Sequence, residues 1–339
     1  MGKNSNRQTK KMTIREVAQL AGVSTATISR VLNEPDKVSK EVKEKVEKVI
    51  EEYNYVPNQL AQKFTTNNSR CIAIFIYDIA NPFFVKIIEG INRISFDNDY
   101  TLFICDSRNN KEREMKYLNY LLGAQVSGII VTEGASEDII KRIGNNIPSV
   151  MIDRNIGPKW HFPIITSDNY NGACTAVEHL IQLNHKKIAF AAGPENICTT
   201  QIRKKGYIDT MKKYGLPIYP GYIYHDDFNV MGGVRSLEHC MSLSEIPTAI
   251  FCANDLLAQG IILRSHSMKL TIPNDISLIG FDGIMPETFY PKITTIQQQV
   301  DQIIECTMEA LFKMINHEKC EGRITIPTKL IIGNTTQKI

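Results

Sequence analysis

Apolar residues recur at helical spacing along the first 55 residues of the chain. The first apolar stripe consists of Ile14, Val17, Ala18, Leu20 and Ala21. Gly22 interrupts this stripe, so a short helix is expected to end there. Ser24 is a preferred N-cap residue, and the helix that it begins is expected to bury Ile28, Val31 and Leu32. Two short helices joined by a tight turn that contains glycine are typical of a helix-turn-helix.

A third helix and a short linker are expected next. The helix begins at Ser39 and turns inward Val42, Val46, Val49 and Ile50. Lys and Glu fill most of its other positions, which is typical of a solvated surface. After Pro57, segment 58–64 is long enough for about two helical turns, and the polar stretch 65–69 follows it. Because so short a helix is marginal in isolation, we expect it to fold only when something binds it.

From Cys71 onward, short apolar runs alternate with amphipathic segments. The runs that predict strands are 71–76, 101–105, 128–131, 149–152, 187–192, 248–252 and 277–280. Segments such as 83–96 and 111–122 have the periodicity of amphipathic helices. The alternation predicts an α/β fold in which helices flank parallel sheets.

Acidic or amide side chains follow nearly every one of these runs. They include Asp78, Asp106, Asp153, Asp168, Asn254 and Asp282. In open α/β sheets, ligands bind beyond the carboxyl ends of the strands. Asp and Asn are also common in turns and at N-caps, so each of these residues taken alone is explained without a ligand. Their recurrence, with Phe83 and Phe84 nearby, favours a polar ligand that is rich in hydroxyl groups.

The charge is distributed unevenly along the chain. The 339 residues carry 39 Lys and Arg against 36 Asp and Glu, a net charge of +3. Residues 1–70 hold 13 basic and 8 acidic side chains, whereas the remainder holds 26 and 28. A small basic module ahead of a larger, nearly neutral part suggests that the first part contacts a polyanion.

Several classes of protein and site are disfavoured. No apolar run approaches the roughly 18 residues of a membrane helix, and no apolar segment follows the basic residues 1–11, so we expect a cytoplasmic protein without a secretory signal. The eight cysteines are scattered without metal-ligand spacing, which predicts reduced thiols and no metal site. No phosphate-binding loop, nucleophile elbow or His-Glu-x-x-His motif is present. We therefore expect no enzyme and no cofactor.

Motifs along the whole chain match one known family. Residues 13–18, 22–33 and 55–58 resemble the DNA-binding headpiece of the lactose-repressor (LacI/GalR) family. Further motifs stand in the family's order at 81–84, 126–130, 193–194, 203–207, 253–255, 277–282 and 294–296. The resemblance covers essentially the whole chain after the basic tail.

The resemblance implies a dimeric repressor whose core is similar to a periplasmic sugar-binding protein. Two α/β lobes with parallel sheets, joined by three crossovers, would hold an effector in the cleft between them. The implied domains are a helix-turn-helix domain at 12–57, a hinge helix and linker at 58–69, and an effector-binding and dimerisation core at 70–339. Lobe 1 is expected at about 70–167 and 295–325, and lobe 2 at about 168–294 and 326–339.

The second helix of a helix-turn-helix enters the major groove of DNA. By the resemblance, Thr25, Ala26 and Arg30 contact base edges, and Arg30 is the best candidate for a bidentate contact to guanine. Phe64 stands where the family generally has a leucine wedge, and other proteins also insert Phe between base steps. The implied DNA-binding set is Ser24, Thr25, Ala26, Thr27, Ser29, Arg30, Asn33, Lys37, Tyr55, Asn58, Ala61 and Phe64.

In the cleft, the resemblance makes Arg203 the residue that binds and orients the effector. A guanidinium forms several directional hydrogen bonds to hydroxyls or to a carboxylate. Acidic and amide side chains supply further polar contacts, and aromatic faces can stack on a sugar ring. The implied effector-binding set is Asp78, Phe83, Phe84, Asp153, Arg203, Phe228, Asn254, Asp255 and Asp282.

The resulting prediction is a homodimeric repressor of carbohydrate-utilisation genes that a small sugar releases from a pseudo-palindromic operator. It would act in the bacterial cytoplasm, associated with the nucleoid. Two alternatives within the family stay open: a catabolite-control regulator switched by a phosphorylated partner protein, and a purine-type repressor that needs a corepressor. A sugar-binding transport protein is disfavoured by the basic headpiece and by the expected lack of a secretory signal.

Overall fold

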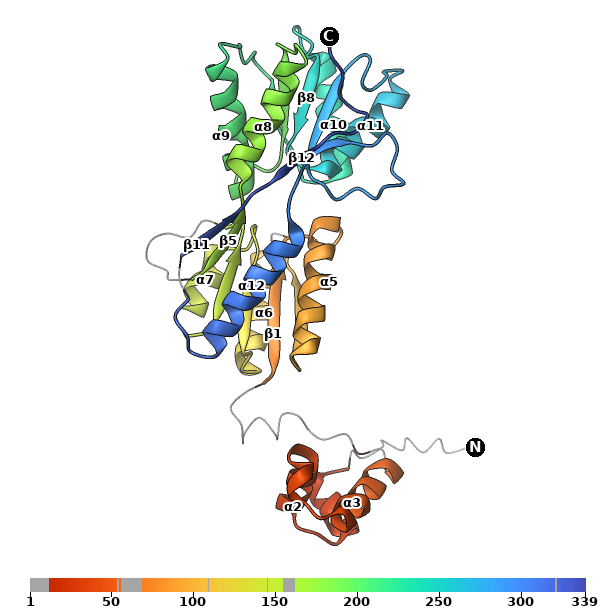
Figure 1. Ribbon diagram of the computed structural model, residues 1–339, viewed down its shortest axis with the longest axis vertical. Coiled ribbons are helices and arrows are strands. Elements are labelled where there is room, and N and C mark those ends of the chain that lie inside the picture. Colours follow the sequence, from red (N-terminus) through yellow and green to blue (C-terminus); the bar gives the residue numbers. More distant parts are fainter. Residues whose placement is uncertain are drawn as a thin grey trace, which may run out of the picture. The chain divides into compact units, whose positions relative to one another are not determined.

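The computed structural model describes residues 12–53, 55, 69–108, 110–144, 146–154, 162–320 and 322–339. The chain divides into two compact units, Met1–Asn68 and Ser69–Ile339. The first unit is helical, and the second consists of two lobes of strands and helices (Figure 1).

The N-terminal unit contains α1 (Ile14–Ala21), α2 (Thr25–Asn33), the 3-10 turn η1 (Pro35–Lys37) and α3 (Lys40–Glu52). Local signals fix the ends of its helices. Thr13 and Glu16 form a capping box at the start of α1, and Gly22 ends this helix in the left-handed conformation, with φ 66°. Ser24 caps α2, since its hydroxyl accepts a hydrogen bond of 3.1 Å from the Thr27 amide.

The three helices enclose a small apolar core. It consists of Val17, Ala18, Ala21, Ile28, Val31, Val46 and Tyr55. The predicted helix-turn-helix is therefore confirmed, with one error in the inward face of α1. Leu20 is 50% exposed, because the 3.6-residue period places Val17, Ala18 and Ala21 on one face of the helix and turns Leu20 away from it.

The first lobe is built on a six-stranded sheet with the order β11-β5-β4-β3-β1-β2, in which every pairing is parallel. Its strands are β1 (Cys71–Ile76), β2 (Thr101–Asp106), β3 (Gly128–Val131), β4 (Ser149–Ile152), β5 (Ile164–Ser167) and β11 (Arg323–Ile326). Its helices are α5 (Pro82–Asp97), α6 (Lys111–Gly123), α7 (Glu137–Ile143) and α12 (Val300–Ile315).

Side chains along β1 alternate between the two faces of this sheet. Ile72, Ile74 and Ile76 pack with residues of α5 and α12, whereas Ala73 and Phe75 pack with residues of α6 and α7. Burial on both faces explains why this strand is a continuous apolar run in the sequence.

The second lobe has the strand order β12-β10-β9-β8-β6-β7 and is parallel except for β12, which runs antiparallel to β10. Its strands are β6 (Ile188–Ala192), β7 (Ile223–His225), β8 (Ala249–Cys252), β9 (Ser277–Asp282), β10 (Thr294–Gln297) and β12 (Lys329–Ile331). Its helices are α8 (Asn169–Gln182), α9 (Cys198–Lys213), α10 (Val230–Ser242) and α11 (Asp255–Ser267). The predicted α/β class with two parallel-sheet lobes is confirmed.

The chain passes between the lobes three times (Figure 1). The crossings lead from β5 to α8, from β10 to α12, and from β11 to β12. The second crossing lies later than the predicted position near residue 295, because β10 pairs with β9 in the second sheet through Gln297. Within the described residues, no helix is long and apolar enough to cross a membrane.

Candidate functional site

Helix α2 presents a polar face in the N-terminal unit. Thr25, Ala26 and Arg30 are exposed, while Ile28 and Val31 lie in the core on the opposite side. An exposed threonine, a methyl group and a guanidinium on one helix face are the groups that base edges in a major groove accept. The first and last turns of α2 thus offer direct contacts to DNA without disturbing the core.

Other members of the implied DNA-binding set have different environments. Ser24 is exposed, and its hydroxyl also lies 2.9 Å from that of Thr27, so both side chains help to form the helix cap. Lys37 is exposed and pairs with Glu34 at 3.2 Å.

Tyr55 is buried in the core of the unit, where its ring packs. Ser29 is partly buried on α2. Asn58, Ala61, Phe64 and the side chain of Asn33 lie outside the described residues.

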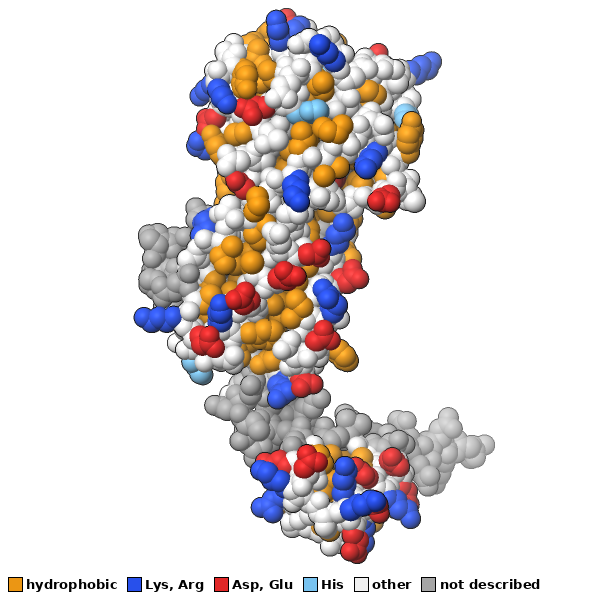
Figure 2. Space-filling model, in the orientation of Figure 1, with side chains coloured by type: hydrophobic (Ala, Val, Ile, Leu, Met, Phe, Trp, Pro, Cys, Tyr) orange, Lys and Arg blue, Asp and Glu red, His pale blue; other side chains and the backbone are white. Residues whose placement is uncertain are grey.

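The surface of the N-terminal unit carries charges of both signs (Figure 2). Several belong to pairs along α3, such as Lys40 with Glu44 and Lys43 with Glu47, each at 3.9 Å. Such exposed pairs contribute little to stability, and they leave the polar face of α2 as the distinctive surface of this unit.

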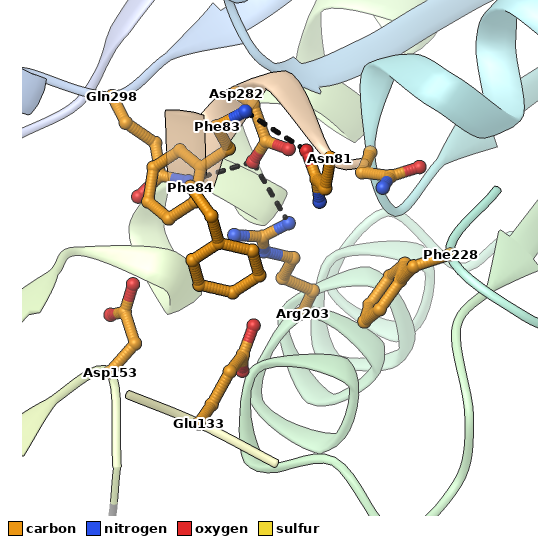
Figure 3. A pocket seen from close by; sticks show the side chains of 10 residues that line it. Asn81, Phe83, Phe84, Glu133, Asp153, Arg203, Phe228, Asp282 and Gln298 are labelled. Atoms are coloured by element: carbon orange, nitrogen blue, oxygen red, sulfur yellow. Dashed lines mark hydrogen bonds and ion pairs between the residues drawn. The ribbon is translucent and has the colours of Figure 1, made fainter. Parts of the chain in front are cut away.

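A pocket lies between the two lobes of the larger unit. Residues that line it are Asn81, Phe83, Phe84, Glu133, Asp153, Arg203, Phe228, Asn254, Asp282 and Gln298. Figure 3 shows Glu133 and Asp153 entering from the first lobe, and Arg203, Phe228 and Asp282 from the second. Its empty volume, open solvent included, is about 280 Å³.

Parallel strands bring most of these side chains together. Glu133 follows β3, Asp153 follows β4, Asn254 follows β8, and Asp282 is the last residue of β9. The carboxyl ends of the strands in both sheets therefore face the pocket, as expected for an open α/β sheet.

Two aromatic residues reach the pocket from the start of α5. The side chain of Asn81 caps this helix by accepting a hydrogen bond of 3.0 Å from the Phe83 amide. Pro82 occupies the first helical turn, and the rings of Phe83 and Phe84 lie edge to face with centroids 5.5 Å apart. Both rings are buried in the core of the first lobe, so they present only part of their surface to a ligand.

Phe228 is the aromatic residue that the second lobe contributes. It is only partly buried, in the loop between β7 and α10. A Cβ atom at Gly193 would lie 2.2 Å from its ring. The absence of a side chain at Gly193 is what allows the Phe228 ring to lie in this position.

Arg203 is held rigidly in the sixth position of α9. Its Nε donates to the Asn169 side chain over 2.9 Å, and its Nη1 donates to the Ala253 carbonyl and forms an ion pair of 3.4 Å with Asp282. The guanidinium carbon lies 3.6 Å from the centroid of the Phe281 ring. These contacts orient the guanidinium before any ligand binds.

The three carboxylates of the pocket have different partners. Asp153 accepts hydrogen bonds from the Thr166 hydroxyl, the Ser167 amide and the Asn169 side chain, at 2.8, 3.1 and 3.0 Å. Asp282 accepts one of 2.7 Å from Gln298, in addition to its ion pair with the guanidinium. Both aspartates have positive φ angles, 51° and 108°, a strained backbone of the kind that is concentrated at functional sites.

Glu133 accepts a hydrogen bond of 2.5 Å from the hydroxyl of Thr199 on α9. This bond joins the first lobe to the second. Burial, with a smaller contribution from the nearby Asp153, raises the pKa of Glu133 to about 7 against the opposing effects of Thr199 and Arg203. Burial also raises the pKa of Asp282 to about 6, against the opposing effect of Arg203. The pocket thus contains carboxyl groups that gain or lose protons near neutral pH.

Two members of the implied effector-binding set lie elsewhere. Asp78 belongs to the turn after β1, where it accepts a hydrogen bond of 3.0 Å from the Ala80 amide. Asp255 is buried and accepts from the Thr295 hydroxyl at 2.7 Å and the Ile284 amide at 2.9 Å. It holds α11 against β10, and this contact gives it a structural role.

Three residues that line the pocket were not in the implied effector-binding set. Glu133 stands two residues after an expected strand, so the rule that pointed to Asp153 could have found it. Asn81 belongs to the motif at 81–84 but was not among the implied effector-binding residues. Gln298 follows β10, which no apolar run predicted. Among the described residues, no group of His, Cys, Asp and Glu could hold a metal ion.

Each of the two units matches a known protein family. Residues 13–58 match the description "Bacterial regulatory proteins, lacI family", and residues 177–336 match "Periplasmic binding protein-like domain". One similar relative is the HTH-type transcriptional repressor CytR of Escherichia coli (strain K12). It is 31% identical over 330 residues, which cover 96% of this chain and 97% of CytR.

Solved structures agree with these matches. The lac repressor dimer bound to operator and the anti-inducer ONPF superposes with a TM-score of 0.83 at 26% identity, covering 97% of this chain and 100% of that chain. A periplasmic binding protein/LacI transcriptional regulator from Alkaliphilus metalliredigens QYMF, complexed with D-xylulofuranose, gives a TM-score of 0.70 at 30% identity, covering 79% and 99%. The resemblance noted in the sequence is confirmed, and the chain belongs to the LacI family: it is a DNA-binding transcriptional repressor, not an enzyme, with a periplasmic-binding-protein-like effector domain.

Proposed function

We propose that this repressor binds a pseudo-palindromic operator as a homodimer and that a small sugar, bound between its lobes, releases it. The observation that carries the proposal is the pocket to which both lobes contribute. Carboxylates, amides and a fixed guanidinium supply directional hydrogen bonds, and Phe228 offers an aromatic surface beside them. Such a lining suits a compact ligand with many hydroxyl groups. The sugar bound to the relative from Alkaliphilus metalliredigens supports the same ligand class.

Contacts between the lobes explain how such a ligand could act at a distance. The Asn169 side chain links Asp153 to Arg203, and Thr199 bonds directly to Glu133. A sugar that hydrogen-bonds to these groups would favour one relative orientation of the lobes over another. The resulting coupling to DNA is typically worth about 1–3 kcal/mol and is reciprocal, so operator must weaken sugar binding as much as sugar weakens operator binding.

On the DNA side, Thr25, Ala26 and Arg30 of α2 would contact base edges in each half-site. The hinge at 58–69, with Phe64 as its wedge, stays a prediction, because 58–68 lie outside the described residues. The genes controlled would serve carbohydrate utilisation, and the protein would act in the cytoplasm, associated with the nucleoid.

Two measurements on the full chain test the proposal. Selection from random duplex DNA should enrich a sequence with two-fold symmetry. A thermal-shift screen against sugars, sugar phosphates and purines should identify the effector, since a ligand at 100 times its dissociation constant adds about 2.7 kcal/mol of stability. The ligand should then weaken operator binding in a fluorescence anisotropy titration. An enriched sequence without symmetry would refute the dimer, and a ligand that tightens operator binding would reverse the sign of the switch.

A further inference from the structure

The charges that line the pocket are unbalanced. Among the described residues that line it, three are carboxylates and one, Arg203, is a cation. The guanidinium pairs with Asp282, and three neutral donors bond to the Oδ1 atom of Asp153. Glu133 has only a neutral hydroxyl, that of Thr199, as its recorded side-chain hydrogen-bond partner. One guanidinium is thus shared among three carboxylates, since Arg203 also acts electrostatically on Glu133 and Asp153. The pocket lining therefore holds more acidic than basic groups.

Charged groups outside the pocket do not remove this imbalance. Arg154 is close enough to interact with Glu133, but Glu114 and Glu137 influence it more strongly. Its Nη1 donates to the carbonyl of Ala135, away from the set that lines the pocket. Arg154 therefore acts on Glu114, Glu137 and Glu133 together, and it offsets the charge of Glu133 only in part.

We propose that Glu133 selects effectors by charge, so that the pocket accepts an uncharged polyhydroxylated ligand and rejects its phosphorylated or carboxylated counterpart. This inference rests on the proposed function and narrows it to one class of sugar or nucleoside. A ligand hydroxyl can donate to the free electron pairs of the Glu133 carboxylate. A ligand phosphate or carboxylate would instead place a second anion in a site with little water. At a separation of about 6 Å and the effective dielectric constant of such sites, this repulsion corresponds to roughly 100-fold in affinity.

Matched pairs of ligands test the proposal directly. Suitable pairs are D-glucose with D-glucuronate, D-galactose with D-galacturonate, D-ribose with ribose 5-phosphate, and adenosine with adenosine 5′-monophosphate. The full chain is titrated by calorimetry at about pH 8, where Glu133 is mostly ionised. We expect any pair that binds to favour its uncharged member by on the order of 100-fold.

The variant E133Q removes the charge while keeping the size of the side chain. E133Q should raise the affinity for the acidic ligand of each pair. The ratio of the affinity for the uncharged ligand to that for the acidic ligand should fall by roughly 10-fold or more. A purely structural role for Glu133 predicts that both affinities fall together and the ratio stays constant. E89Q is the matched control, because Glu89 is an exposed glutamate on α5 of the same lobe. If E133Q does not fold, E133A serves as the second variant.

The pH dependence of the wild type gives an independent measurement. A uronate stays ionised at about pH 5.5, so protonation of the protein alone changes its binding. The charged or titratable groups near Glu133 are Asp153, Asp282, Arg203, Arg154 and Tyr77. We expect uronate to bind more tightly at about pH 5.5 than at about pH 8, because the pocket then loses negative charge.

The results of these titrations distinguish a failure of charge selection by Glu133 from a failure of the proposed sugar effector. Equal or tighter binding of the acidic members to the wild type overturns charge selection and leaves a sugar effector intact. An unchanged ratio in both E133Q and E133A shows that Glu133 is not the selecting residue. If no member of any pair binds, the effector class of the proposed function fails, and this inference fails with it.

Discussion

The exposed polar face of α2 and the pocket between the lobes are built in opposite ways. On α2, the exposed residues lie within one short helix, and its cap and its core contacts are all local. The pocket is assembled from positions between 81 and 298, contributed by both lobes and by a crossover. A substitution on α2 should therefore change one contact, whereas a substitution in the pocket should change ligand binding and the stability of the core together.

The largest expected effect of a pocket substitution, on both stability and ligand binding, is that of Arg203→Ala. It removes one partner of a buried ion pair with Asp282, which typically costs about 3–5 kcal/mol. We expect the free energy of unfolding of the core to fall by that amount and effector binding to be lost. Urea denaturation followed by circular dichroism measures the first, and thermal shift measures the second. Arg203→Lys serves as the control, since it keeps the charge without the planar fork. Wild-type stability and normal release of operator in Arg203→Ala would contradict the assignment.

The next largest expected effect is a change in the free energy of unfolding with pH. The pKa values of Glu133 and Asp282 are raised by burial, to about 7 and about 6. The folded core thus holds these protons more tightly than the unfolded chain. Their contribution is complete below the unfolded pKa values near 4 and is lost as the pH rises through 6 to 7. At about 1.4 kcal/mol for each pKa unit, these two groups should make unfolding roughly 2–4 kcal/mol easier between about pH 5 and pH 8. Burial also raises the pKa of Asp255 to about 7, which adds an effect of the same sign.

Urea titrations of the full chain across this pH range measure the slope. The variant E133Q should reduce the slope, while Asp282 and Asp255 maintain the rest of it. The variant E89Q should leave the slope unchanged. A core that becomes more stable as the pH rises from 5 to 8 would show that other ionisable groups outweigh this pair.

On α2, Arg30→Ala should have a smaller and purely local effect. Loss of a bidentate contact to a base costs about 1–3 kcal/mol of discrimination at one position in each half-site. Affinity for random DNA should change much less, and the thermal stability of the core should be unaltered. Anisotropy titrations on the selected operator and on random duplexes measure the difference. Equal losses on both kinds of DNA would make Arg30 a phosphate contact.

Gly193→Ala should have the smallest effect on binding, and it tests whether the Phe228 ring contacts the ligand. The added Cβ would lie 2.2 Å from the ring of Phe228, which must then move away. Loss of a stacking surface lowers sugar affinity by roughly 10-fold, or about 1.4 kcal/mol. Calorimetry with the identified sugar measures it, and Phe228→Ala should show a similar loss that is not additive with Gly193→Ala. If the two losses of sugar affinity add up in the double variant, Gly193 affects binding independently of Phe228.

The order of helices and the buried strands could be predicted from the sequence because their causes are local. Ser24 and Gly22 mark helix ends by their own backbone and side-chain preferences. Strands buried on both faces, such as β1 and β9, are continuous apolar runs. Strands such as β7 and β12 were missed because each has three residues and incomplete burial, which leaves no recognisable pattern.

The pocket could be predicted only in part. The rule that ligands bind at the carboxyl ends of parallel strands pointed to Asp153 and Asp282. The same rule could not separate Asp282, which lines the pocket, from Asp255, whose oxygens are taken by Thr295 and an amide of a distant loop. Both are carboxylates beside a strand end, and the sequence around them gives no sign of the difference.

The sequence by itself determined the family, the helix-turn-helix and the two parallel-sheet lobes, because caps, periodicity and motif order are properties of short segments. Only the tertiary structure decided which carboxylates line the pocket and which are taken up by hydrogen bonds elsewhere in the protein. The reason is physical: whether Glu133 meets Thr199, or Asp255 meets Thr295, depends on segments 40 or more residues away that pack beside them. The hydrogen bonds and burial that give these side chains their function exist only in the folded chain.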